Sequence, residues 1–447
     1  MTIISRVRPV GCFQVMVSIL ALGCIATFSL TQAVQAADVE APSTSTPPPP
    51  PASPSTTSGG WLDVSTWPVI PVPLVGVDPD SGVTLGILPV WLQTSDQHEI
   101  TRIIAPDLLR NPYFGVGTDF RIFEYPSADE QWSVSAGIKE RVERHLEHEF
   151  QIGRLRETNW SINTSLIYDR SGTSRFYGFG NDSALANVTN YTASQLLGQA
   201  VFGYNLSHTW QLQYTARARR MEITPGTLSK VPTIETRYPD VHGLGVTNEV
   251  LNQVALVYDT RDDETIPSRG TQWIVYAGVN GHDATISDSI YSVSGLDART
   301  FVPISSLLPD TVLAAHLAIR YLPSGHEIPF FDLGSIGGGE SDVGGEQLLR
   351  GFGQGRFVDR DSSDVTIELR HRAFGFDAAA SHIDIEVAPF LDMGRVFSRT
   401  STDPFSALHK VVGVGVRGIA RPSVVGYVDI GYGTEGVAVF TGINYPF

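Results

Sequence analysis

The chain contains little cysteine and little lysine. Its 447 residues include two cysteines, Cys12 and Cys24, and both lie near the N-terminus in an apolar segment that we expect to be cleaved off. A mature chain without cysteine excludes structural disulfides, cysteine nucleophiles and cysteine-ligated zinc. Lysine occurs only at Lys139, Lys230 and Lys410, so nearly all of the 31 basic residues are arginine. Because arginine suits carboxylates in confined space, this bias indicates charges that face inward.

Positive charge is scarce in the chain as a whole. The formal net charge is −16, and the loss of Arg6 and Arg8 with the cleaved segment takes it to −18. Contacts to nucleic-acid phosphates require a basic surface. The composition therefore excludes nucleic acid as a partner.

Long apolar runs are also absent from the mature chain. No segment after the N-terminal region approaches 18 consecutive apolar residues, so no transmembrane helix is expected there. The one apolar run, 15–30, follows Arg6 and Arg8 and precedes small residues at 34–36, which is typical of an export signal over 1–36 cleaved near Ala36. A transmembrane anchor and lipoprotein processing before the second cysteine are the less favoured alternatives.

A linker follows the expected signal peptide. Residues 37–60 are rich in Pro, Ser, Thr and Gly, which predicts an extended, disordered tether. This stretch leaves no room for a folded module before Trp61.

Strict alternation of polar and apolar residues dominates the remainder. It occurs in residues 160–168, 210–218, 365–371 and 382–387. A period of two places the two sets on opposite faces of a sheet. A soluble sandwich shows the same alternation, but here one face carries Arg, Glu, Asp and Gln and the other carries aromatics near strand ends. With an export signal, this pattern predicts a transmembrane barrel with lipid outside and water inside.

The length of residues 61–447 fits an antiparallel, all-β barrel of about sixteen strands, at ~10 residues per tilted strand plus connections. The last segment alternates from Val437 to Phe447 and ends on an aromatic residue. An exposed edge of this kind is an aggregation hazard in a soluble sheet, but it suits a closing barrel strand. We expect Ile443, Tyr445 and Phe447 to serve as a signal for the barrel-assembly machinery.

Five motifs resemble those of one family, and they occur in that family's order. They are Arg175–Asn181, Tyr258–Asp262, Leu349–Phe352 after the glycines at 337–339, Phe390–Gly394 and Ile443–Phe447. They resemble the bacterial surface antigen superfamily of outer-membrane barrels, which includes the BamA and TamA insertases and the two-partner secretion transporters. The resemblance covers the chain from about Val69 to Phe447.

The resemblance implies a loop, 337–361, that folds into the barrel and places Arg350 against a carboxylate of the inner wall. In that family the partner carboxylate lies in the strand motif that here contains Asp392 and Gly394. Parity also places Asp392 and Glu368 on the inner face. We therefore expect Arg350 to insert between these two carboxylates.

The two residues after Arg350 have expected roles of their own. Gly351 would let the loop turn without a Cβ, and Phe352 would pack the loop tip. The alternative is that Arg350 is an ordinary arginine of the lumen. We call the contact of Arg350 with Glu368 and Asp392 the lock, and it would serve either as a brace of the barrel or as a gate.

Two charged segments suggest metal sites only weakly. His145, His148 and Glu149 are conceivable ligands, but a solvated turn explains the dense charge of 140–149 better. The acids of 259–264 suit Ca²⁺ chemically, but Arg261 lies among them. We expect no metal and no cofactor.

No Gly-x-Ser-x-Gly turn occurs in the chain, and Ser335 lacks the leading glycine. A lipase or protease site on the barrel wall, built from residues such as His316, His382 and Asp384, is a remote alternative. We expect a protein that is not an enzyme.

The expected function is a role in biogenesis of a Gram-negative-type outer membrane, or in transport of a protein or lipid client. The insertases and transporters of the family carry periplasmic polypeptide-transport domains that receive unfolded chains by strand addition. Only a tether precedes this barrel, so the resemblance implies the fold and the lock but not the handling of substrate. A passive diffusion pore and a plugged structural barrel are the alternatives. Outer-membrane lipids are expected partners in each case.

Overall fold

The computed structural model describes residues 69–78, 82–95, 100–282, 290–304, 306, 308–338, 349–378, 381–399, 403–420, 424–443 and 445–447. The expected signal peptide, the linker, residues 61–68 and the stretch 339–348 of the expected loop lie outside these residues. Among the described residues, no helix has the length and apolar character to cross a membrane.

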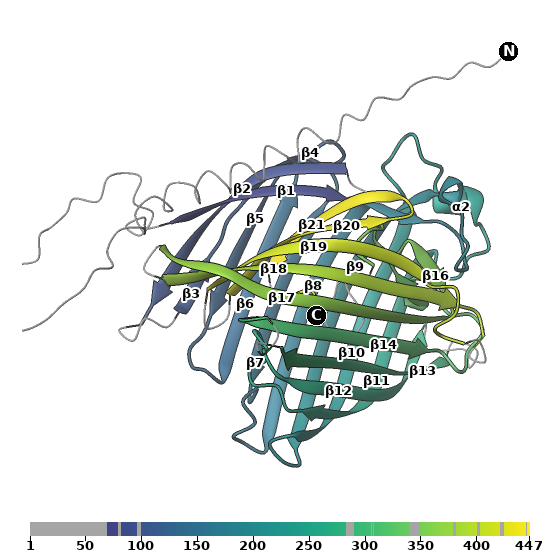
Figure 1. Ribbon diagram of the computed structural model, residues 1–447. Coiled ribbons are helices and arrows are strands. Elements are labelled where there is room, and N and C mark those ends of the chain that lie inside the picture. Colours follow the sequence, from purple (N-terminus) through teal and green to yellow (C-terminus); the bar gives the residue numbers. More distant parts are fainter. Residues whose placement is uncertain are drawn as a thin grey trace, which may run out of the picture. The chain divides into compact units, whose positions relative to one another are not determined.

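Antiparallel strands make up most of the described chain, and Figure 1 shows them side by side. The first ten strands are β1 (Ile70–Asp78), β2 (Gly82–Thr94), β3 (Ile100–Ile104), β4 (Leu108–Asn111), β5 (Gly115–Glu124), β6 (Glu130–Lys139), β7 (Arg144–Ile152), β8 (Trp160–Phe176), β9 (Thr189–Asn205) and β10 (Trp210–Pro225). The others in the same sheet are β11 (Gly245–Asp259), β12 (Gly270–His282), β13 (Ile290–Pro303), β14 (Thr311–Tyr321), β17 (Asp361–Ala378), β18 (Ser381–Phe397), β19 (His409–Ala420), β20 (Val424–Gly433) and β21 (Gly436–Ile443).

Nineteen of the described strands form one sheet, and β1 also pairs with β21, which closes the sheet into a barrel. The short β3 and β4 both pair with β2 and β5, so together they fill one position in the barrel wall. The all-β barrel expected from the alternation is confirmed. The described strands fill eighteen positions of the wall, where about sixteen were expected.

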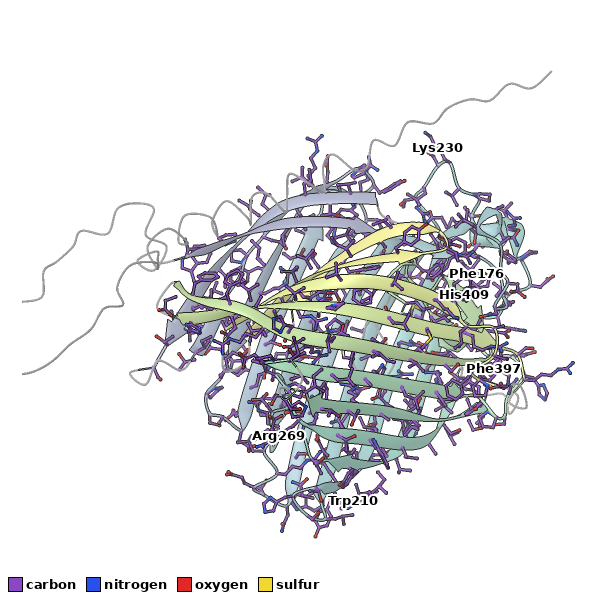
Figure 2. The ribbon with its side chains drawn as sticks, in the orientation of Figure 1. Phe176, Trp210, Lys230, Arg269, Phe397 and His409 are labelled. Carbon is purple, nitrogen blue, oxygen red and sulfur yellow. The ribbon has the colours of Figure 1, made fainter. Side chains whose placement is uncertain are left out.

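The two ends of the barrel differ in the length of their connections. One end carries the β8–β9, β10–β11 and β14–β17 connections, of which the second contains the short helix α2 (Ile234–Arg237) and the third contains the hairpin of β15 (Gly334–Ile336) and β16 (Phe357–Asp359). Figure 2 labels Phe176, Phe397 and His409 toward this end, whereas Trp210 and Arg269 lie away from it. The opposite end carries shorter turns. Transmembrane barrels keep short turns on the periplasmic side and long loops outside the cell.

The outer surface of the wall is apolar and the inner surface polar. Along β10, Leu212 is 48% exposed, whereas its neighbour Gln211 is 4% exposed and faces inward. Near the short-turn end, aromatic rings of adjacent strands touch, with Trp160 and Tyr204 centroids 4.8 Å apart and Trp210 next to Tyr258. An apolar band bordered by an aromatic girdle is typical of a wall that faces lipid.

The inner surface contains buried charge, as the arginine bias predicted. Arg350, Arg370 and Arg417 are the three largest of the fully buried side chains among the described residues. They lie on the side of the lumen formed by β17–β20.

The C-terminal segment departs from the expected strand. β21 ends at Ile443, so the strand does not continue to Phe447. Alternation would point Tyr445 and Phe447 outward, but the Phe447 ring stacks on His316 inside the barrel and Tyr445 donates to the lumen carboxylate Glu386. Arg370 lies over both rings, 4.0 Å from the centroid of Tyr445 and 4.8 Å from that of Phe447. Cation–π attraction and burial thus outweigh the continuation of the strand.

The barrel closes through a short seam. Every residue of β1 has a partner in β2, but within the described strands a single pair, Val77 and Val439, joins β1 to β21. β21 pairs along its whole length with β20. Among the described residues, the ladder between β1 and β21 is therefore far shorter than the ladder that joins each of them to its other neighbour.

The assignment of the lipid face can be tested on adjacent residues of β8. Leu166 points outward and is 51% exposed midway along the apolar band, whereas Ser165 points inward opposite Gln199. We expect Leu166→Arg to lower the free energy of unfolding by about 2–4 kcal/mol, since arginine is costly at the bilayer midplane. Ser165→Arg should change it little. Denaturant titration of the barrel in lipid vesicles measures both, and equal losses would contradict the assignment.

Candidate functional site

Arg350 lies at the centre of the lumen network. Its Nε and Nη2 donate to the two carboxylate oxygens of Asp392 on β18 at 3.0 and 2.8 Å, and its backbone N–H donates to Asp392 Oδ2 at 3.0 Å. Its Nη1 donates to Glu368 of β17 at 2.6 Å and to Asp429 of β20 at 2.6 Å. The bidentate bond fixes the guanidinium orientation. The structure thus brings together Arg350, Glu368 and Asp392, and adds Asp429.

Glu368 is shared by three arginines. Besides Arg350, Arg417 of β19 donates to both of its oxygens at 2.7 and 2.9 Å, and Arg370 donates to Oε2 at 2.9 Å. Arg417 also bonds Glu386 at 3.2 Å. Strands β17–β20 are thereby joined through side chains on their lumen face as well as through their backbone hydrogen bonds.

Burial makes this network strongly electrostatic. Arg350 and Glu368 are 0% exposed, and the Phe390 ring lies 3.5 Å from the Arg350 guanidinium carbon. Burial alone disfavours a charged arginine, but the carboxylates of Asp392, Glu368 and Asp429 outweigh it and raise the pKa of Arg350 well above its usual value. Arg350 is therefore permanently charged in the docked loop.

Glycines let the loop backbone reach the wall. A Cβ on Gly431 of β20 would overlap the carbonyl oxygen of Arg350, and one on Gly351 would lie 2.8 Å from the backbone N of Gly433. Gly351 thus allows close approach, whereas the left-handed turn next to it is made by Leu349, with φ of 48°. A Cβ on Gly394 would lie 3.0 Å from the carbonyl oxygen of Ser363.

Phe352 packs the described part of the loop against the wall. It is 0% exposed and belongs to an apolar cluster that joins the loop to β18 and β19, formed by Ile336, Leu349, Phe352, Phe357, Phe390, Val396 and Val411. The Phe357 ring stacks on His409 with centroids 3.8 Å apart. The loop is therefore held by apolar packing as well as by charge.

A second contact anchors the same β14–β17 connection to the opposite wall. Asp332 of the connection pairs with Arg219 of β10 and accepts from the hydroxyl of Tyr291 on β13 at 2.5 Å. Arg219 also pairs with Glu249 of β11. Burial by itself would raise the pKa of Asp332, but the nearby Arg219 guanidinium has the larger effect. The pKa of Asp332 therefore lies well below its usual value. Here the wall supplies the cation and the loop the anion, the reverse of the Arg350 site.

A third contact gives a role to the Arg175–Asn181 motif. Arg356 of the loop donates to the hydroxyl and carbonyl oxygens of Ser183 at 2.9 and 2.7 Å and to Glu435 at 2.7 Å. Its guanidinium lies 4.4 Å from the Tyr177 ring centroid. Phe179 forms a parallel bridge to Val358. The β8–β9 connection thereby clamps the loop.

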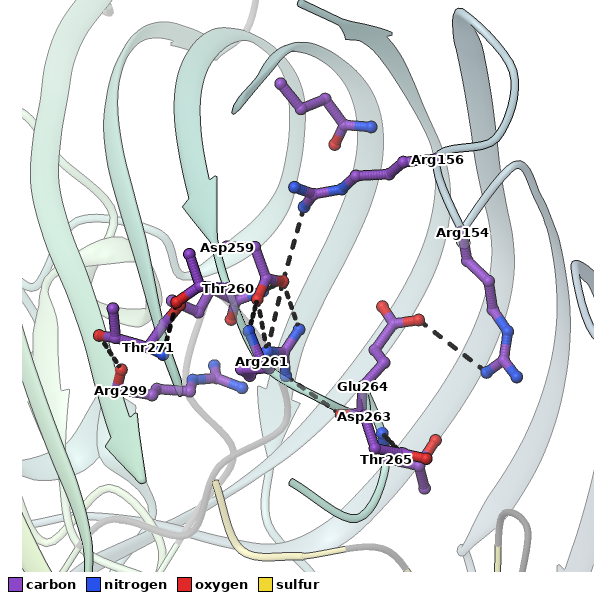
Figure 3. Close-up of polar contacts among 12 residues, drawn as sticks. Arg154, Arg156, Asp259, Thr260, Arg261, Asp263, Glu264, Thr265, Thr271 and Arg299 are labelled. Carbon is purple, nitrogen blue, oxygen red and sulfur yellow. Dashed lines mark hydrogen bonds and ion pairs between the residues drawn. The ribbon is translucent and has the colours of Figure 1, made fainter. Parts of the chain in front are cut away.

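The acids of 259–264 are engaged by neighbouring groups, and Figure 3 shows Asp259 with Arg261 and Arg156 and Glu264 with Arg154. Asp259 accepts from Arg261 Nη2 at 2.8 Å, Asp262 accepts from the backbone N of Ser268 at 2.9 Å, and Asp263 accepts from the backbone N of Thr265 at 2.8 Å. These bonds use the oxygens that a calcium ion would need.

The other candidate metal ligands are not brought together. His145 faces the lumen and contacts Glu147 at 3.4 Å, while His148 and Glu149 follow on alternating faces of the same strand. Among the described residues no group of three metal-ligating side chains occurs.

The histidines considered for catalysis lie apart. His316 is buried between Asp297 at 3.0 Å and Asp364 at 3.4 Å. His382 lies beside Asp384 at 3.2 Å and is half exposed. Within the described part of the chain, the hydrogen-bond partners of His316 and His382 are aspartates and not serines.

Comparison with known proteins identifies the family. A model of the Omp85 superfamily domain matches residues 129–422. The chain belongs to the Omp85 superfamily. This confirms the resemblance to the BamA and TamA barrels, and it places this Omp85 barrel in a Gram-negative-type outer membrane. No curated protein matches the chain significantly.

The solved structures to which the chain is similar include BamA and CdiB, each at low sequence identity. BamA from Haemophilus ducreyi lacking POTRA domains 1–3 is 12% identical with a TM-score of 0.47, over 86% of this chain and 75% of that one. CdiB from Escherichia coli is 11% identical with a TM-score of 0.45, over 85% of this chain and 62% of that one. CdiB from Acinetobacter baumannii is 12% identical with a TM-score of 0.43, over 84% and 59%.

Sequence reasoning missed three members of the lock. The sequence pattern did not single out Asp429, Arg417 or Gly431. Arg417 and Asp429 nevertheless lie at inward positions of two strands whose polar and apolar residues alternate. The alternation of inward and outward residues along β19 and β20 was the signal that could have found these two charged residues. Nothing in the pattern marks Gly431, because its role depends on where the loop lands.

The lock can be tested by a double-mutant cycle. We expect Arg350→Ala to cost about 3–5 kcal/mol of unfolding free energy, since it leaves buried carboxylates without their cation. Asp392→Ala should also destabilise, and the double variant should lose less than the sum. Arg269→Ala, which removes an exposed side chain 3.9 Å from Asp262, should stay within about 1 kcal/mol. Additive losses in denaturant titrations would mean that Arg350 and Asp392 are not coupled.

A second test leaves every charge in place. Gly431→Ala inserts a methyl group where the Arg350 carbonyl lies, whereas a Cβ on Gly426 in the same strand meets nothing within 4 Å. We expect Gly431→Ala to cost about 1–3 kcal/mol and to expose the loop to trypsin at Arg350 and Arg356. Gly426→Ala should resist trypsin like the unmodified chain. Equal resistance of both variants would contradict the docked position of the loop.

Proposed function

We propose that this Omp85 barrel acts in outer-membrane biogenesis or transport, by helping a protein or lipid client to enter the membrane at the seam between β1 and β21. The observation that carries the proposal is the single residue pair that joins these strands. Unpaired backbone groups along a strand edge offer a template for an added strand. A client strand would satisfy these groups while it leaves the aqueous side.

The anchored loop supports a role at the seam rather than an open channel. Arg350, Asp332 and Arg356 attach the β14–β17 connection to β17–β20, to β10 and to the β8–β9 connection. These attachments stiffen β17–β20 and leave the β1–β21 junction as the weakly joined part of the wall. The loop would then act as a brace that keeps the rest of the barrel closed while the seam opens.

The proposed role is non-enzymatic and uses no cofactor. The buried His316 is occupied by Asp297, Asp364 and the ring of Phe447. Partners would be the membrane lipids, an unfolded protein or lipid client, and the barrel-assembly machinery. We propose that this machinery reads Ile443, Tyr445 and Phe447 before the last two side chains turn inward.

A passive diffusion pore is the second candidate, and one observation favours it. On β7 and β8 the inward side chains of His145, Glu147 and Asp169 are 34%, 31% and 38% exposed, in contrast to the fully buried lock. This side of the lumen contacts water. A diffusion pore would require a continuous path of water from these residues, past the loop, to both ends of the barrel.

A disulfide across the seam separates the two functions. We expect Val77→Cys with Val439→Cys to abolish client insertion when oxidised and to restore it on reduction, because the seam can then no longer open. The control pair, Tyr214→Cys with Val254→Cys, joins directly opposed residues of β10 and β11 and should insert clients in both states. The measurement is the yield of folded outer-membrane proteins in cells that express each variant.

Bilayer conductance of the same variants tests the pore. If the oxidised seam variant supports normal membrane assembly, the insertion proposal is wrong. A large conductance that is unchanged by the seam disulfide would then favour the pore.

A further inference from the structure

Two arginines face each other on the outer surface of the barrel. Arg144 on β7 is directly opposite Arg170 on β8 in the antiparallel register. Both belong to the outward set, since the next outward pair in the register is Leu146 with Tyr168, which are 46% and 37% exposed. Directly opposed side chains have Cβ atoms about 4.5–5.5 Å apart, and like charges at this separation destabilise a sheet.

The pair lies at the outer edge of the apolar band. Arg170 is ten residues beyond Trp160 of the aromatic girdle on the same face of β8. At ~3.3 Å per residue and a tilt of about 45°, ten residues rise about 23 Å, close to the height of the lipid-facing band. Since the girdle marks the short-turn side, the pair lies at the headgroup level of the leaflet on the long-loop side.

No carboxylate of the described chain neutralises the pair. Arg144 donates through Nη1 to the carbonyl oxygens of Lys139, Arg141 and Glu143, each at 2.7 Å. Arg170 is exposed and makes no hydrogen bond or ion pair with another described residue. Across β8, its other neighbour in the register is Ser194.

The acids of the adjacent β6–β7 turn are occupied elsewhere. Glu140 accepts from the backbone N of Val116 at 3.2 Å. Glu143 is buried and accepts from the backbone N of Gly172 at 2.8 Å. Arg141 of the same turn is exposed, and its Nη1 donates to the carbonyl oxygen of Tyr113.

We propose that Arg144 and Arg170 form a binding site for the phosphate of an outer-leaflet glycolipid of the lipid A type. A phosphate between two guanidinium groups would accept several charge-assisted hydrogen bonds and remove their repulsion. The apolar surface of Leu146 and Tyr168 directly below offers contact for an acyl chain. The charges of this site belong neither to the lock nor to the seam. A test of lipid binding at this site is therefore independent of a test of the proposed function.

The chain contains a matched control at the same depth. Arg220 is ten residues beyond Trp210 on the outward face of β10, and it is also exposed. Its register partners are Leu196 and Asn248, and its Nη1 lies 3.4 Å from the Asn248 side-chain oxygen. Arg220 therefore shares the depth and the charge but has no second arginine opposite.

The test uses the full-length folded barrel in a neutral detergent, titrated with bisphosphorylated lipid A and read by native mass spectrometry. We expect Arg170→Gln and Arg144→Gln each to weaken lipid A binding at least tenfold, and Arg220→Gln to change it less than twofold. A dephosphorylated lipid A should bind the unmodified chain as weakly as the arginine variants do. Gel mobility before and after heating confirms that each variant is folded.

A second measurement has the opposite sign. Without lipid, Arg170→Gln should be at least as stable to heat as the unmodified chain, because it relieves repulsion, whereas lipid A should stabilise the unmodified chain more. Equal binding of phosphorylated and dephosphorylated lipid, or equal losses for Arg220→Gln and Arg170→Gln, would overturn the proposal. Full displacement of lipid A by millimolar inorganic phosphate would also overturn it, since the site would then bind a free anion and not a lipid.

Discussion

The buried carboxylate of Glu368 is the group on which the organisation of this barrel depends. A fully buried carboxylate is tolerated only when cations and donors surround it, and here Arg350, Arg370 and Arg417 all converge on it. Two of these arginines belong to the wall, and the third is delivered by a loop. The wall therefore carries more buried carboxylates here than arginines, and the docked loop supplies Arg350 as a further cation. This couples the position of the loop to the stability of β17–β20.

The same network extends to the end of the chain. Arg370 bonds the backbone oxygen of Phe447 at 3.2 Å, and Tyr445 donates to Glu386, which in turn accepts from Arg417. The segment that follows β21 is thus held by groups that also hold the loop. The lumen network and the strand beside the seam share contacts, so the seam borders the most strongly braced part of the wall.

The outward and inward residues of the strands have different roles. Outside, aromatic rings near Trp160 and Trp210 and arginines ten residues further on mark the two edges of the lipid-facing band. Inside, the described part of the loop packs against β18 and β19, whereas polar groups on β7 and β8 are partly exposed. Membrane position and internal closure are consequently set by different residues of the same strands.

The sequence by itself determined the barrel, the inward direction of Glu368 and Asp392, and, through the motif that contains Arg350, the lock between them. Alternation suffices for these because a period of two assigns every residue of a continuous strand to a face. The tertiary structure alone decided which inward charges meet, since Asp429 and Arg417 reach the lock through the register of four strands. It also decided that Tyr445 and Phe447 turn inward, because parity holds only while the chain stays in the sheet. Gly431 is needed for the same reason, as only the docked loop defines the space that a side chain there would fill.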